Sequence, residues 1–141
     1  MYRKILVALE NSRTDKSLLA HVQQLAGLAH SQLLLLHVAD GWAARNFNSL
    51  KLAESEEMKA DRTYLENTAE SLRTAGLIAS VQLALGDPPA EIIKTAEREN
   101  CDLIAMGSHG HKLVGDLVFG STINKVRHDT DIPVLLVREI K

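Results

Sequence analysis

Cysteine, aromatic side chains and excess charge of either sign are all scarce in this sequence. Cys101 is the only cysteine among the 141 residues, so no disulfide can form within the chain, which fits a reducing compartment. Aromatic residues make up 4% of the sequence, too few for a surface on which nucleic-acid bases stack. The formal net charge of −2 gives no attraction to a phosphate backbone. We therefore expect no nucleic-acid partner.

Long hydrophobic runs are also absent. No segment approaches the length of about 20 consecutive apolar residues that a membrane-spanning helix needs. The amino terminus, MYRKILVALENS, begins with basic residues, but its apolar part is too short for a signal peptide and ends at Glu10. The sequence predicts a protein without membrane contact, located in the cytoplasm.

What the sequence does contain is a regular alternation of short apolar runs and amphipathic segments. Continuous apolar runs rich in branched residues are typical of strands buried on both faces. Five such runs are expected as strands: Ile5–Leu9, Gln32–Val38, Ile78–Leu85, Asp102–Met106 and Pro133–Val137. Four segments between these runs are expected as helices. In the first, Leu18, Val22, Leu25 and Ala29 recur at spacings of three and four. The other three are Ser49–Thr74, a segment starting at Pro88, and Ser121–His128.

Several residues mark the limits and the buried faces of these helices. A stripe of Met58, Leu65, Ala69 and Leu72 is expected to face the core, and Gly76 to end that helix. Asp87 is expected to cap the next helix, with Pro88 in its first position. The alternation predicts one domain, residues 1–141, of the α/β class: an open, mainly parallel, Rossmann-like sheet with helices on both faces.

The stretch GSHGHKLVGDLVFGST, residues 107–122, is rich in glycine and lies between the fourth strand and the last helix. Open parallel sheets bind ligands beyond the carboxyl ends of their strands, where the strand order reverses. Gly107 and Gly110 would let the main chain approach a ligand closely, because glycine lacks Cβ. The expected helix start at Ser121 would offer unpaired N–H groups to a phosphate. A long polar connector, with Ser121 as a plain helix cap, is equally consistent with the composition.

Neither of two familiar nucleotide motifs is present. No Gly-Lys-Ser/Thr sequence forms a P-loop, and no Gly-x-Gly-x-x-Gly follows the first strand. The spacing Gly107-x2-Gly110-x9-Gly120-Ser121 instead resembles the ATP-binding signature of the universal stress protein family. Further segments resemble that family in the same order along nearly the whole chain: Ile5–Ser12, Leu36–Val38, Gly86–Pro88 with Ile92–Ile93, Cys101–Gly107, Gly120–Val126 and Pro133–Val137.

The resemblance implies the strand order 3-2-1-4-5 and an ATP-binding protein of the stress response that usually dimerises. Adenine would lie near Ala8 and Val38, and the ribose beside Met106 and Gly107. Glu10 stands where many members have aspartate, and would reach a ribose hydroxyl or a metal-bound water. Main-chain N–H and hydroxyl groups would hold the phosphates, and the residues that would supply them are Gly110, Gly120, Ser121 and Thr122.

The expected function is therefore binding of an adenine nucleotide, ATP with or without Mg²⁺, with little or no hydrolysis. A slow ATPase and an interaction module that binds no nucleotide remain alternatives. Catalysis would need a positioned base and carboxylates for Mg²⁺, and no spacing here requires them, so no catalytic residue and no metal ligand is assigned. His37 is expected to pack near the crevice rather than act as a base. The last strand would lie exposed at the sheet edge, which favours a homodimer through this C-terminal strand.

Overall fold

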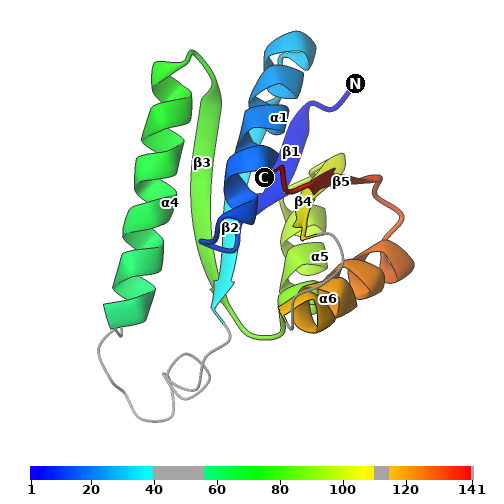
Figure 1. Ribbon diagram of the computed structural model, residues 1–141. Helices are drawn as coiled ribbons and strands as arrows, with labels where there is room; N and C mark the ends of the chain where they lie inside the picture. Colours follow the sequence, from blue (N-terminus) through cyan, green and yellow to red (C-terminus); the bar gives the residue numbers. More distant parts are fainter. Residues whose placement is uncertain (40–55, 110–114, 141) are drawn as a thin grey trace.

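The computed structural model describes residues 1–39, 56–109 and 115–140, with the stretch 115–120 described by its backbone alone. Its strands form one sheet in the order β3-β2-β1-β4-β5 (Figure 1). All neighbouring strands are parallel, and their bounds are β1 Lys4–Ala8, β2 Gln32–Ala39, β3 Ile78–Leu85, β4 Leu103–Ser108 and β5 Val134–Arg138. The predicted fold class and strand order are confirmed.

The helices cover the two faces of this sheet in pairs. Their bounds are α1 Thr14–Ala29, α4 Glu56–Thr74, α5 Pro88–Arg98 and α6 Gly115–Asp129. Along β1, Ile5 and Val7 pack with the buried side chains of α1 and α4, whereas Leu6 between them packs with those of α5 and α6. This alternation follows from the two-residue period of a strand. Both faces of the central strands are therefore buried, which explains their continuous apolar runs.

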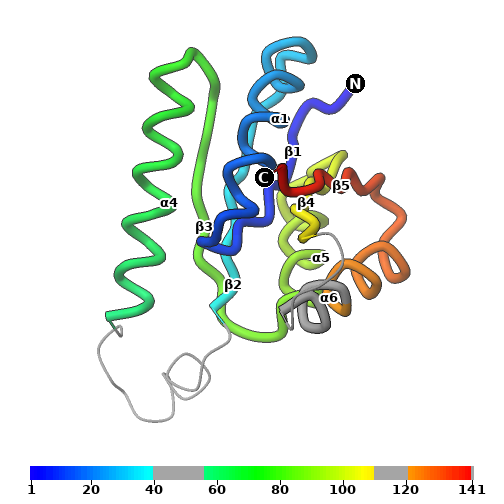
Figure 2. Tube along the Cα trace, in the orientation of Figure 1, coloured from blue at the N-terminus to red at the C-terminus, as the bar shows by residue number. Residues whose placement is uncertain are grey.

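The chain reverses its direction of travel across the sheet at β1. Figure 2 shows the trace passing from the dark blue β1 to the cyan β2 on one side, and returning later to the yellow β4 on the other. The connections that follow β1 and β4 therefore lead to opposite sides of the sheet, and the crevice beyond the carboxyl ends of these two strands is the usual ligand site of open parallel sheets.

Most of the expected helix signals are confirmed. Met58, Leu65, Ala69 and Leu72 are buried on α4, and Gly76 follows that helix with a φ of +93°, a conformation that favours glycine. Asp87 precedes α5 at the cap position with extended backbone, but its side chain makes no capping hydrogen bond, so that expectation was wrong in its chemistry. Part of the predicted Ser49–Thr74 helix and the segment after β2 lie outside the described residues.

The start of the last helix was predicted wrongly. α6 begins at Gly115, six positions before Ser121, so Ser121 lies inside the helix rather than at its first turn. The unpaired N–H groups of a helix lie in its first turn, and Ser121 is beyond that turn. The prediction was wrong because glycines such as Gly115 and Gly120 usually indicate a loop. A helix nevertheless tolerates a glycine at a cost of about 1 kcal/mol, and α6 contains both. Among the described residues, no helix is long and apolar enough to cross a membrane.

Candidate functional site

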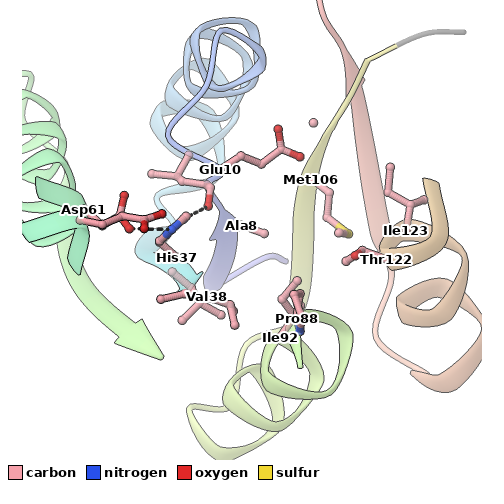
Figure 3. Close-up of a pocket in the computed structure, with 15 residues that line it drawn as sticks. Ala8, Glu10, His37, Val38, Asp61, Pro88, Ile92, Met106, Thr122 and Ile123 are labelled. Atoms are coloured by element: carbon pink, nitrogen blue, oxygen red, sulfur yellow. Dashed lines mark hydrogen bonds and ion pairs between the residues drawn. The ribbon is translucent and has the colours of Figure 1, made fainter. Parts of the chain in front are cut away.

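A cavity of about 360 Å³ opens at the carboxyl ends of β1, β2 and β4 (Figure 3). Its lining comes from the ends of these strands and from α4, α5 and α6, and consists of Ala8, Leu9, Glu10, Leu36, His37, Val38, Ala39, Glu57, Asp61, Pro88, Ile92, Met106, Gly107, Thr122 and Ile123. A cavity of this size is in the range of small-molecule sites, which run from about 300 to 1,000 Å³.

One side of the cavity is apolar. Figure 3 shows Val38, Pro88 and Ile92 below Ala8, with Met106 and Ile123 opposite them. Ala8 ends the central strand β1, which has β2 and β4 on either side, and its small side chain leaves room between these walls. This part of the cavity suits a flat, weakly polar group.

Glu10 is the acidic group at the end of β1. Its Oε2 accepts hydrogen bonds from the Ser12 hydroxyl at 2.9 Å and from His109 Nε2 at 2.9 Å. Burial raises the pKa of the Glu10 carboxyl, and the contacts with Ser12 and His109 offset part of that rise. The carboxylate is therefore held in one position by groups from the loops after β1 and β4.

His109, directly after β4, joins three parts of the chain. Its ring lies 3.0 Å from the Thr14 hydroxyl at the start of α1, and its Nδ1 lies 4.0 Å from a carboxylate oxygen of Glu139 after β5. The main chain reinforces this junction, since the Glu139 N–H donates to the Ser108 carbonyl at 2.8 Å. The loop after β1, the loop after β4 and the C-terminal segment thus meet at one imidazole.

The turn between β1 and α1 is shaped by a buried carboxylate. Asp15, 2% exposed, accepts the N–H groups of Glu10 at 3.0 Å and Asn11 at 2.8 Å, and the Tyr64 hydroxyl at 2.7 Å. Burial and the neighbouring Asp15 raise the pKa of Tyr64 far above its ordinary value, so the phenol stays a donor. Asn11 has a φ of +60°, a left-handed conformation that asparagine tolerates better than most residues. Asp15 thereby orients the backbone that carries Glu10.

A second histidine and a second carboxylate lie on the α4 side of the cavity. His37 Nδ1 donates to the Leu9 carbonyl at 2.8 Å, and His37 Nε2 lies 3.2 Å from Asp61 Oδ2 (Figure 3). Asn11 donates to the other oxygen of Asp61 at 3.0 Å. Both ring nitrogens of His37 are therefore engaged, and the expectation that it packs near the crevice is confirmed.

Gly107 supports helix packing at the floor of the site. A Cβ added to Gly107 would overlap the Thr14 methyl group, because α1 begins directly against this point of β4. From the sequence, we expected that Gly107 is a glycine so that a ligand can approach the main chain. The structure instead shows that the space is taken by Thr14 of α1.

The structure brings together most of the residues predicted to bind the ligand. The cavity lining includes Ala8, Glu10, Val38, Met106, Gly107 and Thr122. Ser121 is exposed and is not in that lining, Gly120 lies within α6, and Gly110 lies outside the described residues.

Sequence reasoning missed Asp15 and Asp61. Each belongs to an amphipathic helix, where a carboxylate ordinarily indicates a solvated face. The only available signal was Asp15 at the start of its helix, a position that also suits an ordinary helix terminus. Nothing local identifies Asp61, because its partners Asn11 and His37 are distant in sequence. Among the described residues, no group of three or more histidine, cysteine, aspartate or glutamate side chains is arranged to hold a metal ion.

An open parallel sheet with a cavity at the reversal of its strand order is the architecture of a doubly wound α/β ligand-binding domain. The family model of the universal stress proteins matches residues 1–138. The chain belongs to the universal stress protein family.

Individual members of the family are similar over almost their whole length. Universal stress protein MJ0577 of Methanocaldococcus jannaschii is 32% identical over 158 aligned positions, which cover 98% of this chain and 96% of that protein. The solved structure of MJ0577 superposes with a TM-score of 0.82 at 31% identity and covers 100% of this chain and 99% of the other.

Two further solved structures are nucleotide complexes. A universal stress protein in complex with cAMP has a TM-score of 0.72 at 16% identity, covering 99% of this chain and 98% of the other. The Archaeoglobus fulgidus protein in complex with dAMP has a TM-score of 0.70 at 19% identity, covering 96% and 98%. At these identities the likeness is one of fold.

Proposed function

We propose that this chain binds an adenine nucleotide, with ATP as the preferred ligand, in the cavity between β1 and β4. The observation that carries the proposal is the cavity itself, which lies where the strand order reverses and whose lining includes Ala8, Val38 and Met106. Members of the family with the same fold hold cAMP and dAMP, which supports the class of ligand.

The chemistry of the lining suits such a ligand. The apolar walls around Ala8, Val38 and Met106 would take the base, and the carboxylate of Glu10 would lie on the ribose side. Thr122 enters the cavity from α6 and would direct its hydroxyl group to a phosphate. Gly110, Gly120 and Ser121 complete the proposed phosphate contacts.

Binding with little or no hydrolysis is favoured over catalysis. A general base needs a free lone pair within reach of the attacking water. Both ring nitrogens of His37 are engaged, so His37 does not meet this requirement, and the contacts of Glu10 with Ser12 and His109 hold its Oε2 in place. We infer a regulator that responds to nucleotide in the cytoplasm, rather than an efficient ATPase.

The identity of any nucleotide that copurifies tests this proposal. Mass spectrometry of the purified protein should find ATP, without ADP accumulating over hours, and titration calorimetry with and without Mg²⁺ should measure its affinity. The variant Gly110→Val should abolish binding, whereas the matched control Gly27→Ala, on the exposed side of α1, should leave it unchanged. Equal affinity in both variants would favour an interaction module that binds no nucleotide.

The same proposal includes a homodimer through β5. This strand is an edge of the sheet, and Leu136 on it is 43% exposed. Exposed apolar edge strands are a hazard unless they are covered. Light scattering should give the mass of a dimer, and Leu136→Lys should give that of a monomer. A monomeric wild type at working concentrations would contradict this part of the proposal.

A further inference from the structure

The described lining of the cavity is acidic. Glu10, Glu57 and Asp61 contribute carboxylates, and the described lining contains no lysine or arginine. An anionic nucleotide would therefore meet like charges, whose repulsion is stronger in a partly enclosed site than in bulk water. A cationic group beside these carboxylates would favour the proposed binding.

Two of these carboxylates each lie against a histidine. His109 Nε2 is 2.9 Å from Glu10 Oε2, and His37 Nε2 is 3.2 Å from Asp61 Oδ2. All four side chains are mostly buried, with exposed fractions between 9% and 17%. Salt screens buried pairs much less than exposed ones. These histidine–carboxylate pairs, defined as Glu10–His109 and Asp61–His37, therefore set the charge of the cavity wall.

The hydrogen-bond geometry suits histidine rings that carry two protons. His37 faces an oxygen acceptor on each side, the Leu9 carbonyl and the Asp61 carboxylate, so both contacts are satisfied when both nitrogens bear hydrogen. His109 lies between the carboxylates of Glu10 and Glu139, with the Thr14 hydroxyl beside its ring. In that state each pair carries no net charge.

We propose that His37 and His109 are positioning residues of the nucleotide site, each fixing one carboxylate of the wall and cancelling its charge so that an anionic ligand can bind. The inference rests on the proposed function. Removing either histidine should therefore weaken nucleotide binding, and neutralising its carboxylate partner as well should relieve part of that loss.

The other charged groups around the pairs do not replace this effect. Glu139 faces His109 from the end of β5, and the largely exposed Arg13 lies 3.5 Å from the other oxygen of that carboxylate. Asp15 adds a negative charge near Glu10 from α1. On the α4 side, Asp61 also accepts from the neutral Asn11 amide, and Glu57 lies at the exposed rim of the cavity.

The test measures ATP affinity by calorimetry for the wild type, His109→Gln, Glu10→Gln/His109→Gln and the control His21→Gln. Glutamine keeps an N–H donor but carries no charge, and His21 is exposed on α1. We expect His109→Gln to bind about fivefold more weakly than the wild type. The double variant should bind more tightly than His109→Gln, because the uncompensated carboxylate is gone, but more weakly than the wild type, because Glu10→Gln also changes the proposed ribose contact.

The parallel pair of variants His37→Gln and Asp61→Asn/His37→Gln should follow the same pattern. If His109→Gln and His37→Gln both keep the wild-type affinity, the inference is overturned while the proposed function stands. If the wild type binds no ATP, the proposed function itself fails, and this inference fails with it.

A measurement on the ligand-free protein tests the Glu10–His109 pair independently of nucleotide. The contact with His109 lowers the pKa of the Glu10 carboxyl against the rise caused by burial. NMR of the labelled carboxyl group should therefore show a higher pKa for Glu10 in His109→Gln than in the wild type, with His21→Gln unchanged. An unchanged Glu10 titration would show that the pair does not act as described.

Discussion

Replacing Gly107 by alanine tests how β4 packs against the start of α1. A Cβ at this position would overlap Thr14 Cγ2, and it would lie 3.5 Å from Thr14 Cβ and 3.7 Å from the Thr14 carbonyl oxygen. Thr14 is 0% exposed, so its methyl group has no open space to enter. Rotating the side chain would also displace the hydroxyl that lies 3.0 Å from His109 Nδ1. The clash must therefore be relieved by a shift of backbone.

Overpacking of this kind costs about 1–3 kcal/mol. We expect Gly107→Ala to lower the free energy of unfolding by about 2 kcal/mol, which corresponds to a fall in Tm of roughly 6 °C for a chain of this length. Thr14→Ser keeps the hydroxyl and removes the methyl group, at a cost of about 1 kcal/mol by itself. The double variant should be more stable than Gly107→Ala, because the serine has no methyl group for the new Cβ to overlap, with a coupling free energy of about 1–2 kcal/mol.

Urea denaturation of the four proteins in this cycle gives the measurement. The control is Gly27→Ala in α1, where an added Cβ meets nothing within 4 Å, and we expect it to stabilise the protein by about 0.4–1 kcal/mol. Wild-type stability in Gly107→Ala, or no recovery in the double variant, would refute the packing argument. If Gly107→Ala instead weakened ATP binding at unchanged stability, the glycine would be needed for the ligand, as the family resemblance implied.

Three further predictions concern ionisable groups. Burial raises the pKa of the Cys101 thiol to about 11, from an ordinary value of 9.0, so alkylation by iodoacetamide at pH 8 should be about 100-fold slower in the folded than in the unfolded protein; equal rates would contradict the burial. Slight burial acts to raise the pKa of Asp102, but hydrogen bonds from the backbone N–H groups of Lys4 and Arg3 hold that pKa below 3.8. Asp102→Ala should therefore lower the free energy of unfolding by about 1 kcal/mol at pH 7, and by progressively less as the pH falls below 3.8. A cost independent of pH would argue against these hydrogen bonds. Burial raises the pKa of Glu10 above 4.5, so the folded state favours the protonated carboxyl group. This contribution to the free energy of unfolding is complete below pH 4.5 and is lost as the pH rises through the pKa of Glu10 in the folded protein. Glu10→Gln should therefore gain stability relative to the wild type over that rise in urea denaturation, and a constant difference would contradict the effect of burial.

The sequence alone was sufficient for the architecture and for much of the cavity. Branched apolar runs such as Leu33–Leu36 predict buried parallel strands because both faces of those strands must be covered. The family signature then led to Ala8, Val38, Met106 and Thr122, which lie in the cavity lining. These residues were predictable because backbone periodicity and the order of motifs are properties of the chain read locally.

The tertiary structure decided which polar groups meet. Glu10 and His109 are 99 positions apart and Asn11 and Asp61 are 50 apart, yet each pair lies within hydrogen-bond distance. It also decided that α6 begins at Gly115 and that Gly107 makes room for Thr14. A hydrogen bond or a close contact depends on two surfaces brought together by the fold, and a local pattern specifies only one of them.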